Sequence, residues 1–425
     1  MNAKYLKTKP GKIYRAPLLF LLLASTFLCS LPDQLHGWNS AWYAMDYSLG
    51  VDSRLFVGSF LRLFYPDFLP ASSAYAFNVL STLVLLALLS HVLASVLRLV
   101  ENTPCETGLL ALTTLWLLSP GSPAYLWNTE NMGRFDLYLF LVTLIAAAVF
   151  LHVRAVSVRF AVFTICGMVC LAIHQGYLFT FFPLLAAMYL LTAENRKQLI
   201  AAFSCMAVLG VVFLYFQFFS HIRPGSYEEL ASVLAARTDL PLNESALRFE
   251  YFSGFADSAR ELVTNQLGER IRYGIVTLLL LSPLALLYGW FWQKILRKPA
   301  ALEDMDAPGG KTCLFGGKTL FTRHLPILSS LLLFLPAFVL TIDWGRWFGA
   351  FLTVQFLQVI FLAAKKDAAA CSVLASLSTA VRRHPFPFLC VGIWLGSLQK
   401  FQATLLPDAP AFFASAYRLF HMLFR

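Results

Sequence analysis

The sequence predicts an all-α fold in which residues 1–425 form one integral membrane domain, a bundle of about eleven spanning helices (about 10 to 12). Hydrophobic residues make up 58% of the chain and charged residues 13%, and the mean hydropathy is +0.67. Soluble globular proteins carry nearer 25% charged residues. Apolar runs of roughly 20 residues recur, and Lys and Arg gather in alternate connecting segments, a pattern that orients multi-pass proteins.

The first span is expected at Pro17–Leu31. It follows a basic segment without acids that carries Lys4, Lys7, Lys9, Lys12 and Arg15. No small-residue cleavage site follows the apolar run, so we interpret it as an uncleaved span with a cytoplasmic N-terminus.

The first outer loop is expected at residues 32–73. Arg54, Gly58 and Arg62 recur every four residues within Ser53–Phe64, and aromatic and aliphatic side chains fill the positions between them. This spacing predicts a helix lying in the membrane interface. Gly50 is expected to form the turn that places Asp46 and Asp52 at the head of this helix.

The run Phe160–Leu191 has 32 residues. As one helix it would be roughly 48 Å long, which exceeds a hydrocarbon core of about 30 Å. We therefore expect a break and a tight outer turn at His174-Gln175-Gly176. The other spans are expected at Tyr75–Val100, Leu109–Leu126, Leu137–Val153, Leu199–Phe219, Tyr273–Trp292, Leu325–Ile342, Trp347–Ala364 and Phe386–Phe401.

Three longer connections complete the predicted topology. Residues 220–272 form a long outer loop with helical potential over Glu244–Leu267, and residues 293–323 form a basic cytoplasmic loop. The amphipathic tail Ala409–Arg425 is either interfacial or a short twelfth span. The positive charge fixes topology through short loops, so the net charge of +10 does not indicate nucleic-acid binding.

The turn Asp343–Arg346 separates two apolar runs, and a charged turn near the membrane marks a candidate functional site. The turn Trp127–Asp136 has a similar acid, glycine, arginine and aromatic content. On the predicted topology nine chemically capable residues reach the outer side: Asp46, Asp52, Arg54, Glu130, Arg134, Asp136, His174, Asp343 and Arg346. The structural alternative is a set of ion pairs that lock hairpin tips together. Arg62 and Asp67 are interpreted as an interfacial anchor and a solvated acid.

These residue types fit transfer of a sugar from a lipid-phosphate carrier. Arginine binds phosphate oxygens through two parallel hydrogen bonds, and a carboxylate can accept a proton from a hydroxyl group. Asp46 or Asp52 is the candidate base, and Arg134 and Arg346 would hold the phosphate. Arg54, Glu130, Asp136, His174 and Asp343 are the remaining substrate-binding candidates. No metal-ligand spacing and no cofactor motif is present, and a divalent cation stays an open alternative.

An Asp-bearing, partly helical first outer loop resembles that of GT-C-class membrane glycosyltransferases. About eleven spans with an arginine-rich long outer loop are similar to O-antigen polymerases and ligases. The resemblance implies a polyprenyl-linked sugar donor, used outside the cytoplasm at a bacterial inner membrane in polysaccharide or glycolipid synthesis. The loop reads Met45-Asp46-Tyr47, not a pair of adjacent acids, so the identity of the base and any metal requirement stay open.

Two other classes of function stay open. A transporter or flippase of a lipid-linked or anionic substrate is favoured by the break at His174, because transporters use broken helices. Charges at hairpin tips favour chemistry at the membrane surface instead. A non-catalytic scaffold of an envelope assembly complex is the third reading. The expected partners are membrane lipid, the lipid-linked donor and envelope-assembly proteins.

Overall fold

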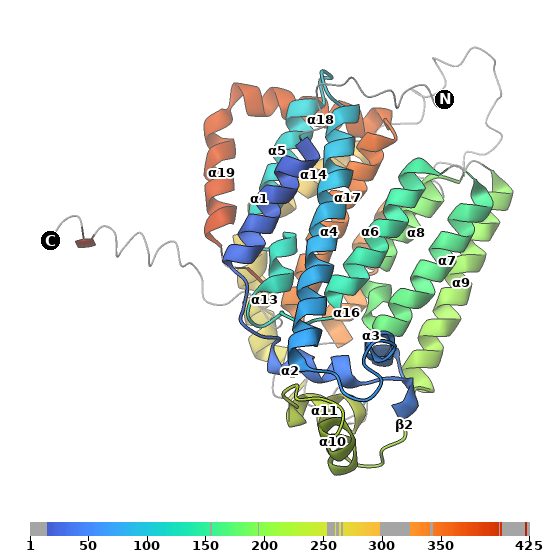
Figure 1. Cartoon of the computed structure of the whole chain (residues 1–425). Helices are drawn as coiled ribbons and strands as arrows, with labels where there is room; N and C mark the ends of the chain where they lie inside the picture. The colour runs from blue at the N-terminus through green and yellow to red at the C-terminus, as the bar shows by residue number, and fades with distance from the viewer. Residues whose placement is uncertain are drawn as a thin grey trace.

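The computed structural model is a bundle of helices that run side by side, with a layer of short helices and loops across one end (Figure 1). It describes residues 15–153, 155–193, 195–252, 260, 263–264, 267–297, 324–340, 343–398, 400–401 and 421–422. The only strands in these ranges are β1 (Gly50–Val51) and β2 (His221–Ile222), which pair antiparallel. The all-α prediction is confirmed. Most of the basic loop and nearly all of the C-terminal tail lie outside the described residues.

The predicted number of spans was wrong. Four helices of the described chain are long and apolar enough to cross a membrane: α4 (Ala71–Leu99), α7 (Val156–Ile173), α9 (Arg196–Phe218) and α17 (Trp344–Ala364). A fifth is obtained if α13 (Leu267–Leu280) and α14 (Ser282–Arg297), which meet at 71°, count as one span. These helices indicate a multi-pass membrane protein. The other apolar runs form helices that are too short, including α1 (Arg15–Cys29), α5 (Glu106–Leu118), α6 (Asp136–His152) and α19 (Pro385–Ser397).

Proline explains several of the interruptions. The run that begins at Phe160 breaks at His174, as predicted, and resumes as η6 (Gln175–Phe179) and α8 (Phe182–Leu191). The predicted span Leu325–Ile342 is instead two helices, α15 (Leu325–Leu332) and α16 (Leu335–Leu340). Pro183, Pro283, Pro326 and Pro336 are the second residues of α8, α14, α15 and α16. Proline is tolerated there because the first N–H groups of a helix need no intrahelical partner, whereas it interrupts a helix that continues through it.

The helix α17 forms the centre of the bundle and is buried along nearly its whole length. Trp116 of α5 stacks on Phe356 with ring centroids 4.2 Å apart. Thr353 donates a hydrogen bond to the Gly121 carbonyl at 3.0 Å. The segment after α17, expected to be a connection, forms α18 (Ala368–Arg383), which packs on α5.

The loop layer combines two segments that are far apart in sequence. The first contains α2 (Gly37–Ser40), η2 (Ala41–Ala44), η3 (Tyr47–Leu49), η4 (Ser53–Leu55) and α3 (Phe56–Arg62); the second contains α10 (Tyr227–Ala235) and α11 (Glu244–Tyr251). The pairing of β1 with β2 joins them, and the Ala71 N–H donates to Asp239 at 2.6 Å. The helix predicted within Ser53–Phe64 is α3, which follows the 3-10 turn η4. The helix expected over Glu244–Leu267 ends at Tyr251, and most residues after it lie outside the described chain.

Candidate functional site

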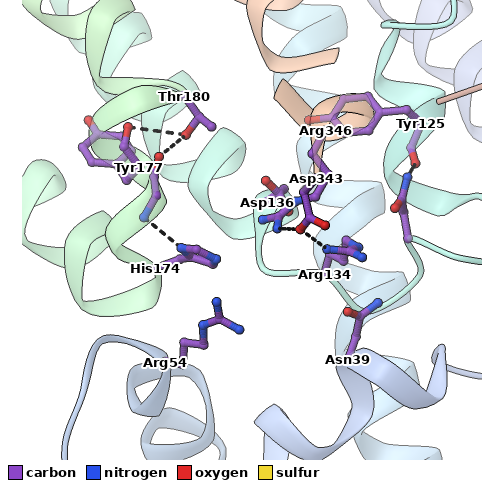
Figure 2. Close-up of polar contacts among 12 residues, drawn as sticks. Asn39, Arg54, Tyr125, Arg134, Asp136, His174, Tyr177, Thr180, Asp343 and Arg346 are labelled. Atoms are coloured by element: carbon purple, nitrogen blue, oxygen red, sulfur yellow. Dashed lines mark hydrogen bonds and ion pairs between the residues drawn. The ribbon is translucent and has the colours of Figure 1, made fainter. Parts of the chain in front are cut away.

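Two arginines and two aspartates meet where α6 and α17 begin, at the end of the bundle that the loop layer covers (Figure 2). Arg346 Nη2 lies 2.7 Å from Asp136 Oδ2, and Arg346 Nη1 lies 2.6 Å from Asp343 Oδ2. The same Asp343 oxygen accepts a hydrogen bond from Arg134 Nη1 at 3.2 Å. The side chains of Arg346 and Asp136 are 6% and 1% exposed. This group is called the arginine cluster below.

Local sequence explains how each of these side chains is positioned on its own segment. Asp343 precedes the first turn of α17, and Asp136 is the first residue of α6, so both carboxylates lie at the positive ends of helix dipoles. Gly133 adopts φ of +92°, a conformation that glycine accepts without strain, directly before Arg134. Asn131 then fixes the turn by donating to the carbonyls of Tyr125 at 2.8 Å and Phe401 at 2.9 Å.

The first loop contributes Asp52 and Arg54. Asp52 Oδ1 caps the 3-10 turn η4 by accepting a hydrogen bond from the Arg54 N–H at 3.2 Å. The Arg54 guanidinium lies 5.0 Å from the centre of the Trp42 ring and pairs with Glu250 at 3.0 Å. Glu250 belongs to α11, so the long loop also reaches the site. Glu250 was not among the predicted site residues, because nothing in its local sequence pattern indicates that it meets Arg54.

His174 lies near three arginines. Its Nδ1 accepts a hydrogen bond from the Gly176 N–H at 2.9 Å, and its side chain is buried. Burial lowers the pKa of His174 well below its ordinary value, and the charges of Arg54, Arg346 and Arg134 lower it further. The imidazole is therefore neutral at physiological pH. In Figure 2 Arg54 points toward His174, while Arg134, Asp343 and Arg346 lie on the other side of the site.

Burial and charge act differently on the two acids that face the arginines. For Asp343, burial raises the pKa, but Arg134 and Arg346 lower it by more, so this carboxyl stays ionised. For Glu250, burial dominates and the pKa is raised, although Arg54 opposes the shift. Glu250 therefore takes up a proton more readily than a solvent-exposed glutamate.

Several buried polar atoms at the site have no hydrogen-bond partner among the described residues. They are Arg54 Nε, Arg134 Nε, Asp136 Oδ1 and the Tyr125 hydroxyl. Buried polar groups in native proteins are normally paired with protein, water or ligand. These atoms therefore offer two donors, one acceptor and one hydroxyl to a bound molecule or to water.

Asp46 has a different set of partners. Its Oδ2 accepts hydrogen bonds from Arg62 at 2.7 Å and Arg237 at 3.0 Å, and its Oδ1 accepts the Ser48 N–H at 2.7 Å. Burial raises its pKa, but the bonds from Ser48 and the two arginines lower it by more. Asp46 thus links Arg62, at the end of α3, to Arg237, just after α10. Arg62, expected to be an interfacial anchor, pairs with Asp46 and has 40% of its side chain exposed.

Glu130 lies in the turn that precedes Arg134. Its backbone carbonyl accepts a hydrogen bond from Asn39 at 3.3 Å, and this contact fastens the first loop to the turn. Within the described ranges, no three His, Cys, Asp or Glu side chains form a group that could hold a metal ion. Of the nine sequence candidates, four form the arginine cluster itself, and Arg54 and His174 lie close enough to interact with its charges. Asp52 caps the turn that carries Arg54, whereas Asp46 and the Glu130 carbonyl make contacts that hold the first loop in place.

Comparison with known proteins gave no match to a protein-family model, to a curated protein or to a solved structure.

Proposed function

We propose that this protein transfers or polymerises sugars from a polyprenyl-phosphate-linked donor on the extracytoplasmic side of a bacterial inner membrane, in the synthesis of envelope polysaccharide or glycolipid. One observation carries the proposal: Arg54, Arg134 and Arg346 come from three distant segments and gather with buried carboxylates at one end of an apolar bundle. Fixed arginines beside lipid suit a substrate that combines a phosphate with a hydrocarbon tail.

In the proposed reaction an acceptor hydroxyl attacks the anomeric carbon of the donor sugar. The bond between that carbon and the phosphate oxygen breaks, and the lipid phosphate or diphosphate leaves with the electron pair. Asp52 takes the hydroxyl proton. Arg134 and Arg346 stabilise the charge that develops on the leaving group. Because Asp136 and Asp343 already hold Arg346, it needs little reorganisation during the reaction.

Asp52 is a better candidate base than Asp46. Two arginines and the Ser48 N–H already occupy the Asp46 carboxylate. Asp52 caps η4 next to Arg54, and it lies close enough to Glu250 for its charge to act on that acid. His174 accepts the Gly176 N–H through Nδ1, so its neutral form carries a proton on Nε2 and can donate to a sugar hydroxyl.

The test is product formation by purified protein in liposomes that contain a polyprenyl-linked sugar donor. The wild type should form glycan, and Asp52→Asn and Arg134→Lys should lose most of the turnover. Arg248→Lys is the matched control, because Arg248 makes exposed ion pairs with Glu228 and Glu244 on the loop layer. Full activity of both site variants, expressed at wild-type levels, would remove the enzyme proposal.

The second candidate function is transport or flipping of a lipid-linked or anionic substrate. The 71° bend between α13 and α14 favours it, as do the interruptions between α7 and α8 and between α15 and α16. Interrupted helices beside charged groups are typical of transporter binding sites. Movement of an unmodified lipid-linked substrate across the liposome membrane, without glycan formation, would favour this candidate. Absence of both activities would favour a scaffold in envelope assembly.

A further inference from the structure

A groove with a volume of about 400 Å³ lies between α5 and α19. Among the described residues, the polar ones in its lining are Thr114 and Ser397. Leu118, Phe388, Leu389, Gly392, Ile393 and Gly396 form the rest of its lining. Leu389 and Ile393 are 57% and 53% exposed, so the groove opens on the apolar surface of the bundle. In a membrane protein the neighbours of such a surface are hydrocarbon chains.

Two glycines shape the groove. Gly392 and Gly396 are about one turn apart on α19, and a Cβ atom on either would lie 3.4 Å or 3.5 Å from a methyl group of Leu118. Glycines at this spacing commonly let two membrane helices approach closely. In this protein the helix that approaches these glycines is α5 of the same chain, through Leu118. A single turn of a second helix, about 10 Å across and 5.4 Å long, would already take up the volume of the groove. The groove is therefore too small for a second helix, and its size suits a single hydrocarbon chain.

Both walls of the groove continue toward the arginine cluster. After α5 the chain passes through η5 (Pro123–Trp127) to the turn that carries Arg134. After α19 it reaches Phe401, whose carbonyl accepts a hydrogen bond from Asn131 in that same turn. Lys400 lies on this path, with its ammonium nitrogen 5.7 Å from the centre of the Trp127 ring. The end of the groove nearest the site therefore leads to cationic side chains, which complement a lipid phosphate.

We propose that the groove between α5 and α19 binds the polyprenyl tail of the lipid-phosphate substrate, with the phosphate directed toward Lys400 and the Arg134 turn. This inference rests on the proposed function and adds to it a site for the apolar part of the substrate. The tail would lie against the glycine backbone of α19 and the side chain of Leu118.

The test uses a polyprenyl phosphate with a photoreactive group in its tail and the full-length protein in liposomes. Gly392→Leu and Gly396→Leu fill the groove with side chains. Gly289→Leu on α14 is the matched control, because no atom lies within 4 Å of the Cβ position of Gly289. Crosslinks should map to α5 and α19 in the wild type and fall about tenfold in the two groove variants, but not in the control. The KM for a long-tailed donor should rise about tenfold, while turnover of a short-tailed donor should not change.

Labelling that is spread over the bundle surface, or that survives both groove substitutions, would overturn the proposal. Equal competition by unlabelled phospholipid and unlabelled polyprenyl phosphate would assign the groove to bulk lipid, and loss of a dimer in the groove variants would assign it to a second copy. Unfolding temperatures of all variants show whether each protein is folded. Specific labelling of the groove without glycan formation by the wild type would refute the proposed function and retain the tail site. Glycan formation that neither groove substitution affects would refute the tail site and retain the proposed function.

Discussion

Arg346 and Asp136 are separated by 210 residues in the chain, and their side chains meet at 2.7 Å where α17 and α6 begin. A buried guanidinium needs such a partner, because an unpaired charge in an apolar interior is strongly destabilising. Asp343 binds the other side of the same guanidinium. The orientation of Arg346 is therefore set before any substrate arrives, which is the condition for effective stabilisation of developing charge.

Arg346→Lys should reduce turnover by about 10²–10³, the loss typical of removing one preorganised donor. A lysine ammonium cannot reproduce the planar fork that bonds Asp136 and Asp343 together. The measurement is the rate of glycan formation in liposomes, with Arg248→Lys as the exposed control. A normal rate in Arg346→Lys would show that the fork plays no part in the reaction.

Asp46→Asn and Asp52→Asn should have opposite effects. Asp46→Asn removes the charge that Arg62 and Arg237 bind, so unfolding should become easier by about 1–3 kcal/mol, while turnover persists. Asp52→Asn should retain stability, because asparagine also caps a helical turn, but it should lose turnover. Thermal unfolding and product formation are measured on the same preparations. The reverse pattern would make Asp46 the base.

His174 should make the folded protein less stable at mildly acidic pH. The folded state depresses the pKa of this residue, so the unfolded chain binds more protons below a pH of about 6.5. The stabilisation is complete above that pH and is lost as the pH falls toward the folded-state pKa. His174→Asn keeps an acceptor for the Gly176 N–H and removes the titration. The unfolding temperature should therefore fall less between pH 7.5 and 5.5 in this variant, and equal slopes in both proteins would contradict the assignment.

Gly274→Ala should perturb the site from outside it. A Cβ atom on Gly274 would lie 2.4 Å from the Trp344 ring, which is next to Asp343. Overpacking of this kind costs roughly 1–3 kcal/mol and would displace the start of α17. Gly268→Ala on the same helix is the control, since no atom lies within 4 Å of that position. Lower stability and turnover are expected in the first variant only, and identical behaviour of the two would show that the contact is unimportant.

The orientation in the membrane can be tested by cysteine labelling. Single cysteines at Ser245 and Ala307 in a cysteine-free background should react with impermeant reagents from opposite sides, because the Lys and Arg distribution predicts that residues 220–272 are outside and 293–323 inside. Ser245 is exposed on α11. Labelling of both positions from the same side would contradict the predicted topology.

The sequence by itself determined the helical class, the break at His174 and the charged turn around Arg134, whereas the predicted turn at Asp343–Arg346 is instead the first turn of α17. Each follows from local composition: apolar runs must be helical in lipid, and a run longer than the membrane must break. The number of continuous spans did not follow. Proline at the second position of a helix is favourable there, yet it interrupts a longer helix, and hydropathy does not distinguish the two cases.

Only the tertiary structure decided which charges meet. Asp46 and Asp52 are six residues apart, yet one binds Arg62 and Arg237, whereas the other lies beside Arg54. Between them Gly50 adopts φ of +149° and pairs with Ile222, so a residue of the long loop sets the direction of the first loop. Glu250 reaches Arg54 through that same long-range packing. Local sequence specifies turns and caps, but ion pairs between distant segments depend on how the whole bundle and its loop layer pack.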